Sequence, residues 1–536
     1  MGQPDSPSLH PPARSSDGSG LLPSLALCLA GGLQAVSLAL PLALPALGLV
    51  RGEPVWWLQW LALSMLVHRL GRSVSARQAA WYGWLFAWGW LSTTFAWLYI
   101  SMHTYGGLSA VLAVLAVLAL AGVLALYYAA AVWAVKTLSP RGLWALAGVF
   151  AAVWLLAELA RGVLFTGFGW GAVGYAQLDG PLATAIPWIG GYGVCALVAG
   201  CAAATARIWQ AAQTRATRST AVRGSVGLLL LLLVLQAVPA VDGGSAGGLD
   251  VTLLQGNIPQ EEKFESASGV PQALRWYGEQ LDTNRSALVI TPETAVPVLP
   301  EQLPPGYWTA LQQRFAGGAQ AALVGVPLGN LSEGYTNSVV GFKPGQAQVW
   351  RYDKHHLVPF GEFIPPMFRW FTDLMAIPLG DFNRGPLPQP TFDWQGQRLA
   401  ATVCYENLFS EELAAQFADA ARAPTMLVNI SNLGWFGEHL AMDQHLQIAR
   451  MRALEFNRPF LLATNTGQTA IVDHLGRVQQ RAPAHVATAL TGEVQGRTGI
   501  TPYAAWVASF GLWPLLILAL IAVMVAAGAR LRAGRV

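Results

Sequence analysis

The run GLSAVLAVLAVLALAGVLALYYAAAVWAV, residues 107–135, carries no charged side chain from end to end. A helix needs about 20 apolar residues to cross the hydrocarbon core of a bilayer, so this run is long enough to span it. The composition of the whole chain agrees: of 536 residues, 54% are hydrophobic and 11% are charged, whereas an ordinary soluble protein has about 25% charged residues. The sequence therefore predicts an integral membrane protein.

Seven further apolar segments flank this run, near 21–40, 54–68, 79–100, 142–160, 182–206, 224–241 and 505–528. The second is short, and the run 41–50 before it holds two prolines. We expect eight transmembrane helices, seven within 21–241 and one within 503–530. A polar tail rich in Pro, Ser and Gly precedes them at 1–20, which we interpret as flexible, and a short cytoplasmic tail follows at 531–536. The 22 tryptophans suit aromatic belts at the membrane interfaces.

Between 245 and 500 the composition changes and charged residues return. Strand-like runs appear there: DVTLLQGNI, ALVITPETAV, AALVGVPLG, RLAATVCYE, TMLVNISN, FLLATNTG and TAIVD. Helical stretches such as EELAAQFADAAR and HLQIARMRALEF lie between some of them. Strands that alternate with helices predict an α/β domain with a largely buried sheet. About 250 residues suffice for a hydrophobic core of its own.

The lysines and arginines of the short loops predict the orientation, because cytoplasmic loops carry an excess of them. With the N-terminus inside, the outer loops hold only Arg51 and Arg161. The inner loops and the C-terminal tail hold Arg69, Arg72, Arg77, Lys136, Arg141, Arg207, Arg215, Arg218, Arg223, Arg530, Arg532 and Arg535. The α/β domain is therefore expected outside the cytoplasm, which is the periplasm of a bacterium with an outer membrane.

Three segments of the α/β domain carry side chains suited to nucleophilic chemistry: ITPETAVP with Glu293, YDKHHLVPFGEFIP with Lys354 and Glu362, and ATVCYENLF with Cys404. The other cysteines, Cys28, Cys195 and Cys201, lie in apolar stretches, so Cys404 is expected to be a free thiol. A thiol attacks as thiolate, and a nearby carboxylate such as Glu293 can take its proton. Lys354 can stabilise the negative oxygen that forms on an attacked ester. The product would be a thioester on Cys404, which an amine can resolve.

The order of a Glu after a strand, a later Lys, and a Cys after another strand resembles the nitrilase superfamily, whose members have an αββα sandwich and a Cys nucleophile. More specifically, the chain resembles the apolipoprotein N-acyltransferase family over nearly its whole length. That likeness rests on WLYISMHTYGG, LFTGFGWGAVGYAQLDGPL, LLQGNIPQ, KHHLVPFGEFIP, CYEN, SNLGWFG, QIARMRALEFNRP and GITPYA. The resemblance implies an inner-membrane enzyme with a Glu293–Lys354–Cys404 triad.

The resemblance also implies the substrates. The acyl donor would be a membrane phospholipid, with phosphatidylethanolamine and its sn-1 chain expected. The acceptor would be the α-amino group of the S-diacylglyceryl cysteine of an apolipoprotein, in the last step of lipoprotein maturation. No cofactor is implied, and a monomer is expected.

Supporting residues follow from the same resemblance. Glu362 corresponds to a further essential glutamate, and other positions shape the pocket or its loops: Tyr405, Glu406, Asn337, Trp435 and Arg452. Two positions depart from the family pattern, since Phe264 stands where Trp is common and Leu433 stands where Asp is common. The change at Leu433 puts loop pairing or acceptor preference in doubt, but it leaves the triad intact.

Simpler interpretations stand beside these. Cys404 could be a small core hydrophobe, Glu293 a solvated carboxylate and Lys354 a surface lysine; only their combination favours catalysis. The histidines at 355, 356, 439 and 445 do not match a zinc pattern, so no metal is expected. The net charge of +3 is too small to indicate nucleic-acid binding. Rival functions are a membrane-anchored amidase or nitrilase-type hydrolase, a transporter or receptor with an outer binding domain, and an inactive relative.

Overall fold

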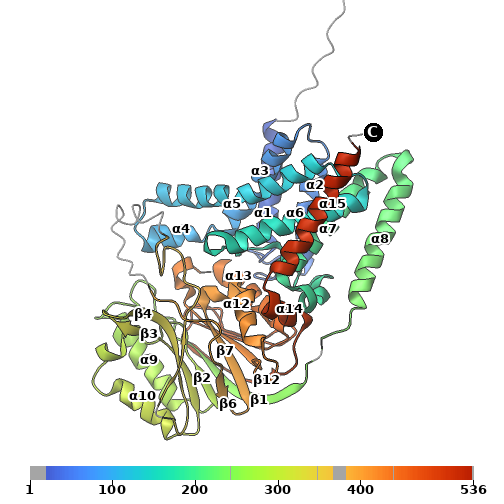
Figure 1. Cartoon of the computed structure of the whole chain (residues 1–536). Helices are drawn as coiled ribbons and strands as arrows, with labels where there is room; N and C mark the ends of the chain where they lie inside the picture. The colour runs from blue at the N-terminus through green and yellow to red at the C-terminus, as the bar shows by residue number, and fades with distance from the viewer. Residues whose placement is uncertain (1–19, 242, 347, 366–381, 439, 534–536) are drawn as a thin grey trace, which may run out of the picture.

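The computed structural model describes residues 20–241, 243–346, 348–365, 382–438 and 440–533. Helices fill the first part of the chain and return at its end, and a domain of two β-sheets stands between them (Figure 1). Most of the expected tail 1–20 and the last three residues of the expected tail 531–536 lie outside the described residues.

Each of the eight predicted apolar segments contains a helix. These are α1 (Leu21–Val36), α2 (Trp56–Leu70), α3 (Ala76–Thr94), α5 (Ala110–Leu138), α6 (Leu143–Val163), α7 (Ile186–Ala212), α8 (Arg218–Gln236) and α15 (Trp513–Ala533). Among the described residues, five helices are long and apolar enough to cross a membrane: α5, α6, α7, α8 and α15, some with a short extension. The helices α1 and α2 have 16 and 15 residues. The membrane class is confirmed, while eight as the number of spans stays a prediction.

Several helix boundaries differ from the predicted ones, and two of the predicted segments are interrupted. The third segment was expected to run to residue 100, but α3 ends at Thr94 and short turns follow, α4 (Leu98–Ile100) and η2 (Ser101–Tyr105). The last segment is divided into α14 (Pro502–Phe510) and α15, because Gly511 between them has a φ of +55°. Hydropathy does not reveal such a break, since glycine interrupts a helix by its backbone conformation and not by its polarity.

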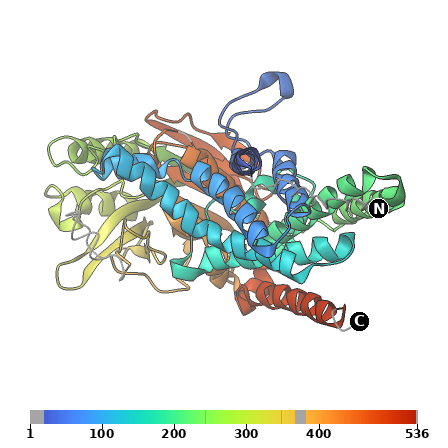
Figure 2. The same cartoon turned by 90° about the horizontal axis from the view of Figure 1, so that it is seen from above.

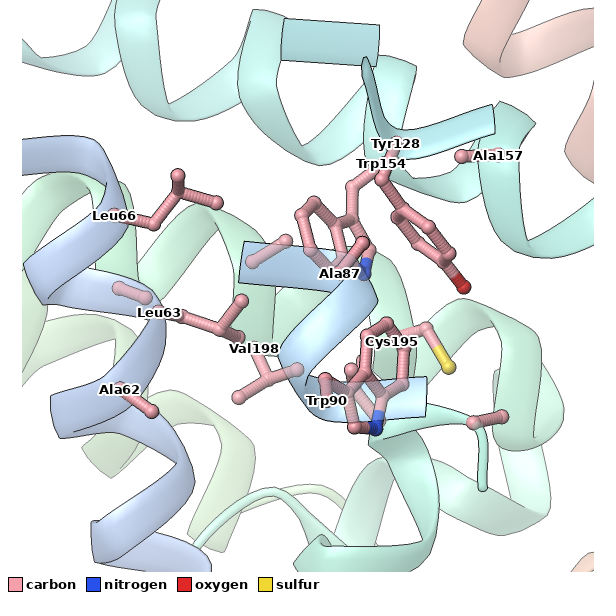
Figure 3. Close-up of a cluster of buried hydrophobic side chains, with 14 of the residues drawn as sticks. Ala62, Leu63, Leu66, Ala87, Trp90, Tyr128, Trp154, Ala157, Cys195 and Val198 are labelled. Carbon is pink, nitrogen blue, oxygen red and sulfur yellow. The ribbon is translucent and has the colours of Figure 1, made fainter. Parts of the chain in front are cut away.

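The helices of the membrane half pack around large aromatic side chains. Trp90 on α3, Tyr128 on α5 and Trp154 on α6 are fully buried, and their rings lie 4.8–6.1 Å apart (Figure 3). Small residues allow α1 and α3 to approach each other closely: a Cβ on Gly31 would lie 2.0 Å from the carbonyl oxygen of Phe86. Close backbone packing at glycine is typical of helix interfaces in membranes.

The α/β domain contains two six-stranded sheets. The first has the order β12-β1-β2-β3-β4-β5, with β12 (Thr488–Arg497), β1 (Ser245–Gln255), β2 (Leu288–Ile290), β3 (Ala321–Asn330), β4 (Gly334–Phe342) and β5 (Trp350–Asp353). The second has the order β11-β10-β9-β8-β7-β6, with β11 (Val478–Arg481), β10 (Ala470–Val472), β9 (Phe460–Thr464), β8 (Met426–Ser431), β7 (Gln397–Val403) and β6 (Phe392–Trp394). The central strands β1-β2-β3 and β7-β8-β9 are parallel, and the outer pairs are antiparallel.

Apolar side chains of both sheets meet in one buried layer, with Val251 and Leu288 from the first sheet and Val403 and Val428 from the second. Helices α9 (Gly269–Thr283) and α10 (Tyr307–Ala316) cover the outer face of the first sheet. Helices α12 (Ser410–Ala414), α13 (Leu440–Phe456) and α14 cover the second. The predicted αββα sandwich is confirmed.

Helices α12, α13 and α14 lie between the second sheet and the membrane half (Figure 1). Seen from above, the membrane helices lie across the sandwich (Figure 2). Helix α13 makes polar contacts between the sandwich and the membrane half. Gln444 Oε1 accepts hydrogen bonds from the indoles of Trp97 and Trp170 at 3.1 and 2.6 Å. Arg450 pairs with Asp179 at 2.6 Å and with Glu53 at 3.1 Å. These contacts fix the sandwich against the loops of the membrane half.

Candidate active site

Three strand ends carry the three predicted catalytic residues. Glu293 follows β2 by three residues, Lys354 follows β5 directly, and Cys404 follows β7 directly. The first two come from one sheet and the third from the other, so the site lies where the two sheets face each other. A rigid sheet behind each side chain holds it in position.

Two of these strand ends turn sharply. Cys404 has a φ of +54° and Thr294, next to Glu293, has a φ of +48°, which are left-handed values that residues other than glycine seldom adopt. Gly325 on β3 makes room for the turn at Glu293, because a Cβ there would lie 2.2 Å from the carbonyl oxygen of Pro292 and 3.0 Å from the Cα of Glu293. The strained turns direct both side chains out of the strand line.

Glu293, Lys354, Glu362 and Asn337 form one hydrogen-bonded cluster. Lys354 Nζ lies 2.8 Å from Glu362 Oε2 and 3.7 Å from Glu293 Oε1. Asn337 Nδ2 donates to Glu293 Oε1 at 2.7 Å and to Glu362 Oε1 at 2.9 Å. The side chain of Lys354 is 1% exposed. Burial alone would lower the pKa of Lys354, but the two carboxylates raise it above its ordinary value, so the ammonium stays charged.

The Cys404 thiol is held next to this cluster. Burial raises its pKa well above 9.0, the negative charge of Glu293 raises it further, and Lys354 and the backbone N–H of Asn432 lower it. That same N–H donates to Glu293 Oε2 at 2.8 Å. The carbonyl oxygen of Cys404 accepts from Asn429 Nδ2 at 3.2 Å and lies 3.3 Å from His445 Nε2. The resting site therefore contains a neutral thiol beside an acceptor carboxylate.

Glu406 links the strand ends of the two sheets. Its carboxylate accepts from the backbone N–H of Val403 at 2.6 Å, beside the cysteine, and from that of His355 at 2.7 Å, beside Lys354. The Tyr352 hydroxyl donates to it at 2.9 Å. Burial raises the pKa of Glu406 to about 7, against the effect of these donors. Glu406 thus positions Cys404 relative to Lys354 without facing the thiol itself.

The other predicted positions lie outside the hydrogen-bonded cluster. The Tyr405 hydroxyl donates at 2.8 Å to the carbonyl oxygen of Gly167, in the loop after α6, so it joins the cysteine turn to the membrane half. Trp435 is 37% exposed, and its ring contacts Tyr105 of the membrane half at 5.5 Å. Phe264 is 52% exposed and Leu433 is fully buried.

Arg452 is the predicted position that the structure places away from the triad. It lies on α13 and pairs with Glu455 at 3.0 Å, at the junction with the membrane half, where Glu455 Oε1 also accepts from the backbone N–H of Gly191 on α7. Both partners of the ion pair are at most 3% exposed. Arg452 therefore lies where the two halves of the molecule meet.

A second lysine in the site was not predicted from the sequence. Lys263 is 1% exposed, and its Nζ donates to the carbonyl oxygen of Glu293 at 2.9 Å. It directly precedes Phe264, shortly after the QGNIPQ entry segment, and this adjacency is the only signal in the sequence that could have singled it out.

The neighbouring histidines have ordinary partners. His355 Nδ1 lies 2.7 Å from the carbonyl oxygen of Gly385, and His356 Nδ1 lies 2.7 Å from Glu412 Oε1. The part of the chain that the structure describes holds no group of three or more His, Cys, Asp or Glu side chains arranged for a metal ion. His439 lies outside the described residues.

Comparisons with known proteins agree with the two-part organisation. Residues 37–204 match the model of the apolipoprotein N-acyltransferase N-terminal domain, and residues 250–503 match that of the carbon-nitrogen hydrolases. The chain is 50% identical to an apolipoprotein N-acyltransferase of Verminephrobacter eiseniae, with 90% of this chain and 92% of that protein covered. It is 43% identical to one of Ralstonia nicotianae, with 84% and 85% covered.

Among solved structures, a carbon-nitrogen hydrolase superfamily protein from Xanthomonas campestris aligns with 50% of this chain and 96% of its own. The sequence identity is 18% and the TM-score is 0.36.

Proposed function

The chain belongs to the apolipoprotein N-acyltransferase family, and on that premise we propose that it moves a fatty acyl chain from a membrane phospholipid to the α-amino group of a diacylated apolipoprotein. Glu293, Lys354 and Cys404 would carry the chemistry through a thioester. The observation that carries this proposal is the meeting of the three side chains from separate strand ends, with Glu293 and Lys354 in one hydrogen-bonded cluster and the Cys404 thiol beside it.

In the first half-reaction, Glu293 takes the proton of the Cys404 thiol, and the sulfur attacks the carbonyl carbon of a phospholipid ester. Negative charge then develops on the carbonyl oxygen, and the Lys354 ammonium stabilises it together with a backbone N–H beside the cysteine. The carbon–oxygen bond of the ester breaks. Glu293 returns the proton to the departing lysophospholipid oxygen, and Cys404 carries the acyl chain as a thioester.

In the second half-reaction, the neutral α-amine of the acceptor attacks the thioester carbonyl. Glu293 takes a proton from the nitrogen, the carbon–sulfur bond breaks, and the same proton returns to the Cys404 sulfur. The product is an amide, and the resting thiol is restored. Because each half-reaction ends with the proton back on a product or on the enzyme, one carboxylate serves both steps.

Glu362 and Asn337 would position the triad, not react. Asn337 bridges the two glutamates, and Glu362 binds Lys354 at 2.8 Å, so the ammonium is held while Glu293 remains able to accept a proton. Phosphatidylethanolamine, with its sn-1 chain, is the donor that we propose.

The site would face the outer leaflet of the bacterial inner membrane. The arginine-rich loops lie at the helix ends opposite the outward loops that α13 contacts, which supports a periplasmic sandwich. Both substrates are lipids, so a catalytic centre fixed against the membrane half would meet them without extracting them from the bilayer.

The rival within the same superfamily is a hydrolase, in which water resolves the thioester. The two differ in product when purified enzyme meets phospholipid and a synthetic diacylated lipopeptide. We expect the N-acylated lipopeptide to form in step with lysophospholipid, and Cys404→Ser to lose nearly all turnover. Free fatty acid as the main product, with the lipopeptide unchanged, would contradict acyl transfer and favour the hydrolase.

A further inference from the structure

Lys263 is the buried cation of the site to which the triad mechanism gives no role. Lys263 lies in the segment between β1 and helix α9. Its side chain contacts the turn that follows β2. Its one hydrogen bond within the described residues goes to the carbonyl oxygen of Glu293, at 2.9 Å. An ammonium group has three N–H donors, and lysine is almost never fully buried unless it is paired.

The charges around Cys404 explain what such a cation would do. Lys354 contacts two carboxylates, those of Glu293 and Glu362, and both raise the pKa of the Cys404 thiol. This group of side chains has an excess of negative charge before the thiol ionises. Each nearby carboxylate disfavours a thiolate, as the raised pKa of Cys404 reflects.

Lys263 lies near enough to Glu293 and Cys404 for their charges to act on it. Burial lowers its pKa to about 7, and the negative charges of Glu293 and Cys404 oppose that decrease. Lys354 contacts the Glu293 carboxylate, at 3.7 Å, whereas Lys263 binds the Glu293 backbone carbonyl. A thiolate on Cys404 would therefore favour the protonated form of Lys263, and by reciprocity a protonated Lys263 favours the thiolate.

We propose that Lys263 is a positioning residue of the acyl-transfer site: it holds the Glu293 turn through the backbone carbonyl, and its ammonium supplies the second positive charge that makes the Cys404 thiolate accessible. The inference rests on the proposed thioester mechanism. It assigns Lys263 no bond to the substrate.

The test compares Lys263→Met, which keeps the side-chain length and removes the charge, with Lys263→Arg, which keeps the charge. The readout is the rate at which iodoacetamide alkylates Cys404 in the purified full-length enzyme from pH 6 to 10, followed by peptide mass spectrometry. This readout needs no lipid donor. A wild-type enzyme that alkylates but forms no acyl adduct with phospholipid would count against the proposed function and not against the role of Lys263.

We expect Lys263→Met to alkylate about tenfold more slowly at pH 7, which corresponds to a shift of about one pKa unit, with its profile moved to higher pH. Lys263→Arg should remain within about threefold of wild type. Lys343 offers a matched control, because its Nζ also donates to one backbone carbonyl, that of Asp393, and lies over a neighbouring phenylalanine ring. Lys343→Met should leave the Cys404 profile unchanged.

A Lys263→Met enzyme with the wild-type alkylation profile and a lowered melting temperature would overturn the inference, because the lysine would then be only structural. If Lys263→Met does not fold, Lys263→Arg decides. In wild type, rising pH removes the proton of Lys263 and with it the second charge, so the rate of acylation should fall on the alkaline side. Lys263→Arg should lack that fall, and an identical fall in both enzymes would overturn the inference.

Discussion

At the scale of single residues, the surroundings of Cys404 favour a neutral thiol. Burial and the Glu293 carboxylate raise its pKa above 9.0, so only a small fraction is thiolate at neutral pH. Reactivity then depends on a base that takes the proton at the moment of attack. Glu293 is held for this by two donors, Asn337 Nδ2 and the backbone N–H of Asn432, which leave its carboxylate fixed next to the sulfur.

Glu293→Gln should therefore slow thioester formation by a factor on the order of 10² to 10⁴ at pH 7, because the amide cannot accept the thiol proton. The remaining rate should rise with pH, since the thiolate fraction increases toward the raised pKa of Cys404. Rapid-quench measurement of the acylated enzyme between pH 6 and 10 checks both statements.

The matched control is Glu301→Gln, on the exposed turn η7 (Pro300–Gln302) of the same sandwich. It should acylate like wild type. A Glu293→Gln enzyme that acylates at the wild-type rate across the pH range would remove Glu293 from the role of base.

The sequence singled out Glu293 and Cys404 because each stands near the end of a recognisable strand, whereas Lys354 follows β5, which the strand patterns missed, and was singled out by its motif. The sequence was not sufficient for Lys263, since a lysine in a polar loop is normally solvated and only the tertiary fold buries it. Arg452 illustrates the opposite case. Its motif drew attention to the position, but the spacing along α13 could not reveal that the side chain turns away from Cys404 to pair with Glu455.

At the scale of elements, α13 connects the two halves of the molecule. Its apolar residues pack on the second sheet, and Gln444, Gln447 and Arg450 contact the loops of the membrane half. The next helical turn of α13 carries Arg452 and Glu455, and Glu455 accepts a hydrogen bond from the backbone of α7. Because the same sheet carries Cys404, the position of α13 determines how the proposed nucleophile is placed relative to the membrane half.

Arg450→Ala should lower the free energy of unfolding by about 1 to 3 kcal/mol, because it leaves Asp179 and Glu53 without their buried partner. The two carboxylates are partly exposed, which keeps the loss below that of a fully buried pair. Thermal unfolding of the detergent-solubilised enzyme measures the difference.

Arg422→Ala is the comparison for this change, because Arg422 forms an exposed pair with Asp419 at 3.9 Å. It should alter stability by no more than about 0.5 kcal/mol. Equal melting temperatures for Arg450→Ala and wild type would show that α13 is not fixed by this ion pair.

Hydropathy and strand patterns predicted some of the helices and strands and missed others. All seven predicted runs contain strands, but β4, β5, β6, β11 and β12 were missed. Several of these are short, or alternate buried and exposed residues as β12 does, so they lack a continuous apolar run. The expected helix at 411–422 is shorter, with α12 and one 3-10 turn, η10 (Ala415–Phe417). Apolar content alone does not fix where a helix stops.

At the scale of the whole molecule, the sandwich is held against the membrane half by buried polar contacts. Arg161, in α6, is 1% exposed and pairs with Glu158 at 2.8 Å. It also donates to the carbonyl oxygens of Phe168 and Trp170 at 2.7 Å. The loop held in this way contacts Tyr405 through Gly167. An ionic pair inside the membrane half thus supports the loop that the turn at Cys404 and Tyr405 contacts.

The proposed orientation predicts which surfaces a membrane-impermeant thiol reagent can reach. Ser332→Cys, in the exposed β3–β4 loop, should be labelled in intact spheroplasts. Ser139→Cys, in the loop between α5 and α6 that also holds Arg141, should be labelled only after the membrane is permeabilised. Labelling is assigned by peptide mass because two native cysteines, Cys28 and Cys404, are partly accessible, whereas Cys195 and Cys201 are buried. The reverse pattern would place the sandwich in the cytoplasm.

The most direct test of the account is the intact mass of the purified enzyme after incubation with phosphatidylethanolamine alone, wild type beside Cys404→Ala. The account predicts an added fatty-acyl mass on the wild type, none on the variant, and loss of that mass as an amide product when a diacylated lipopeptide is added. A folded wild-type enzyme that gains no acyl mass, or a Cys404→Ala enzyme that gains the same mass, would contradict a thioester on Cys404.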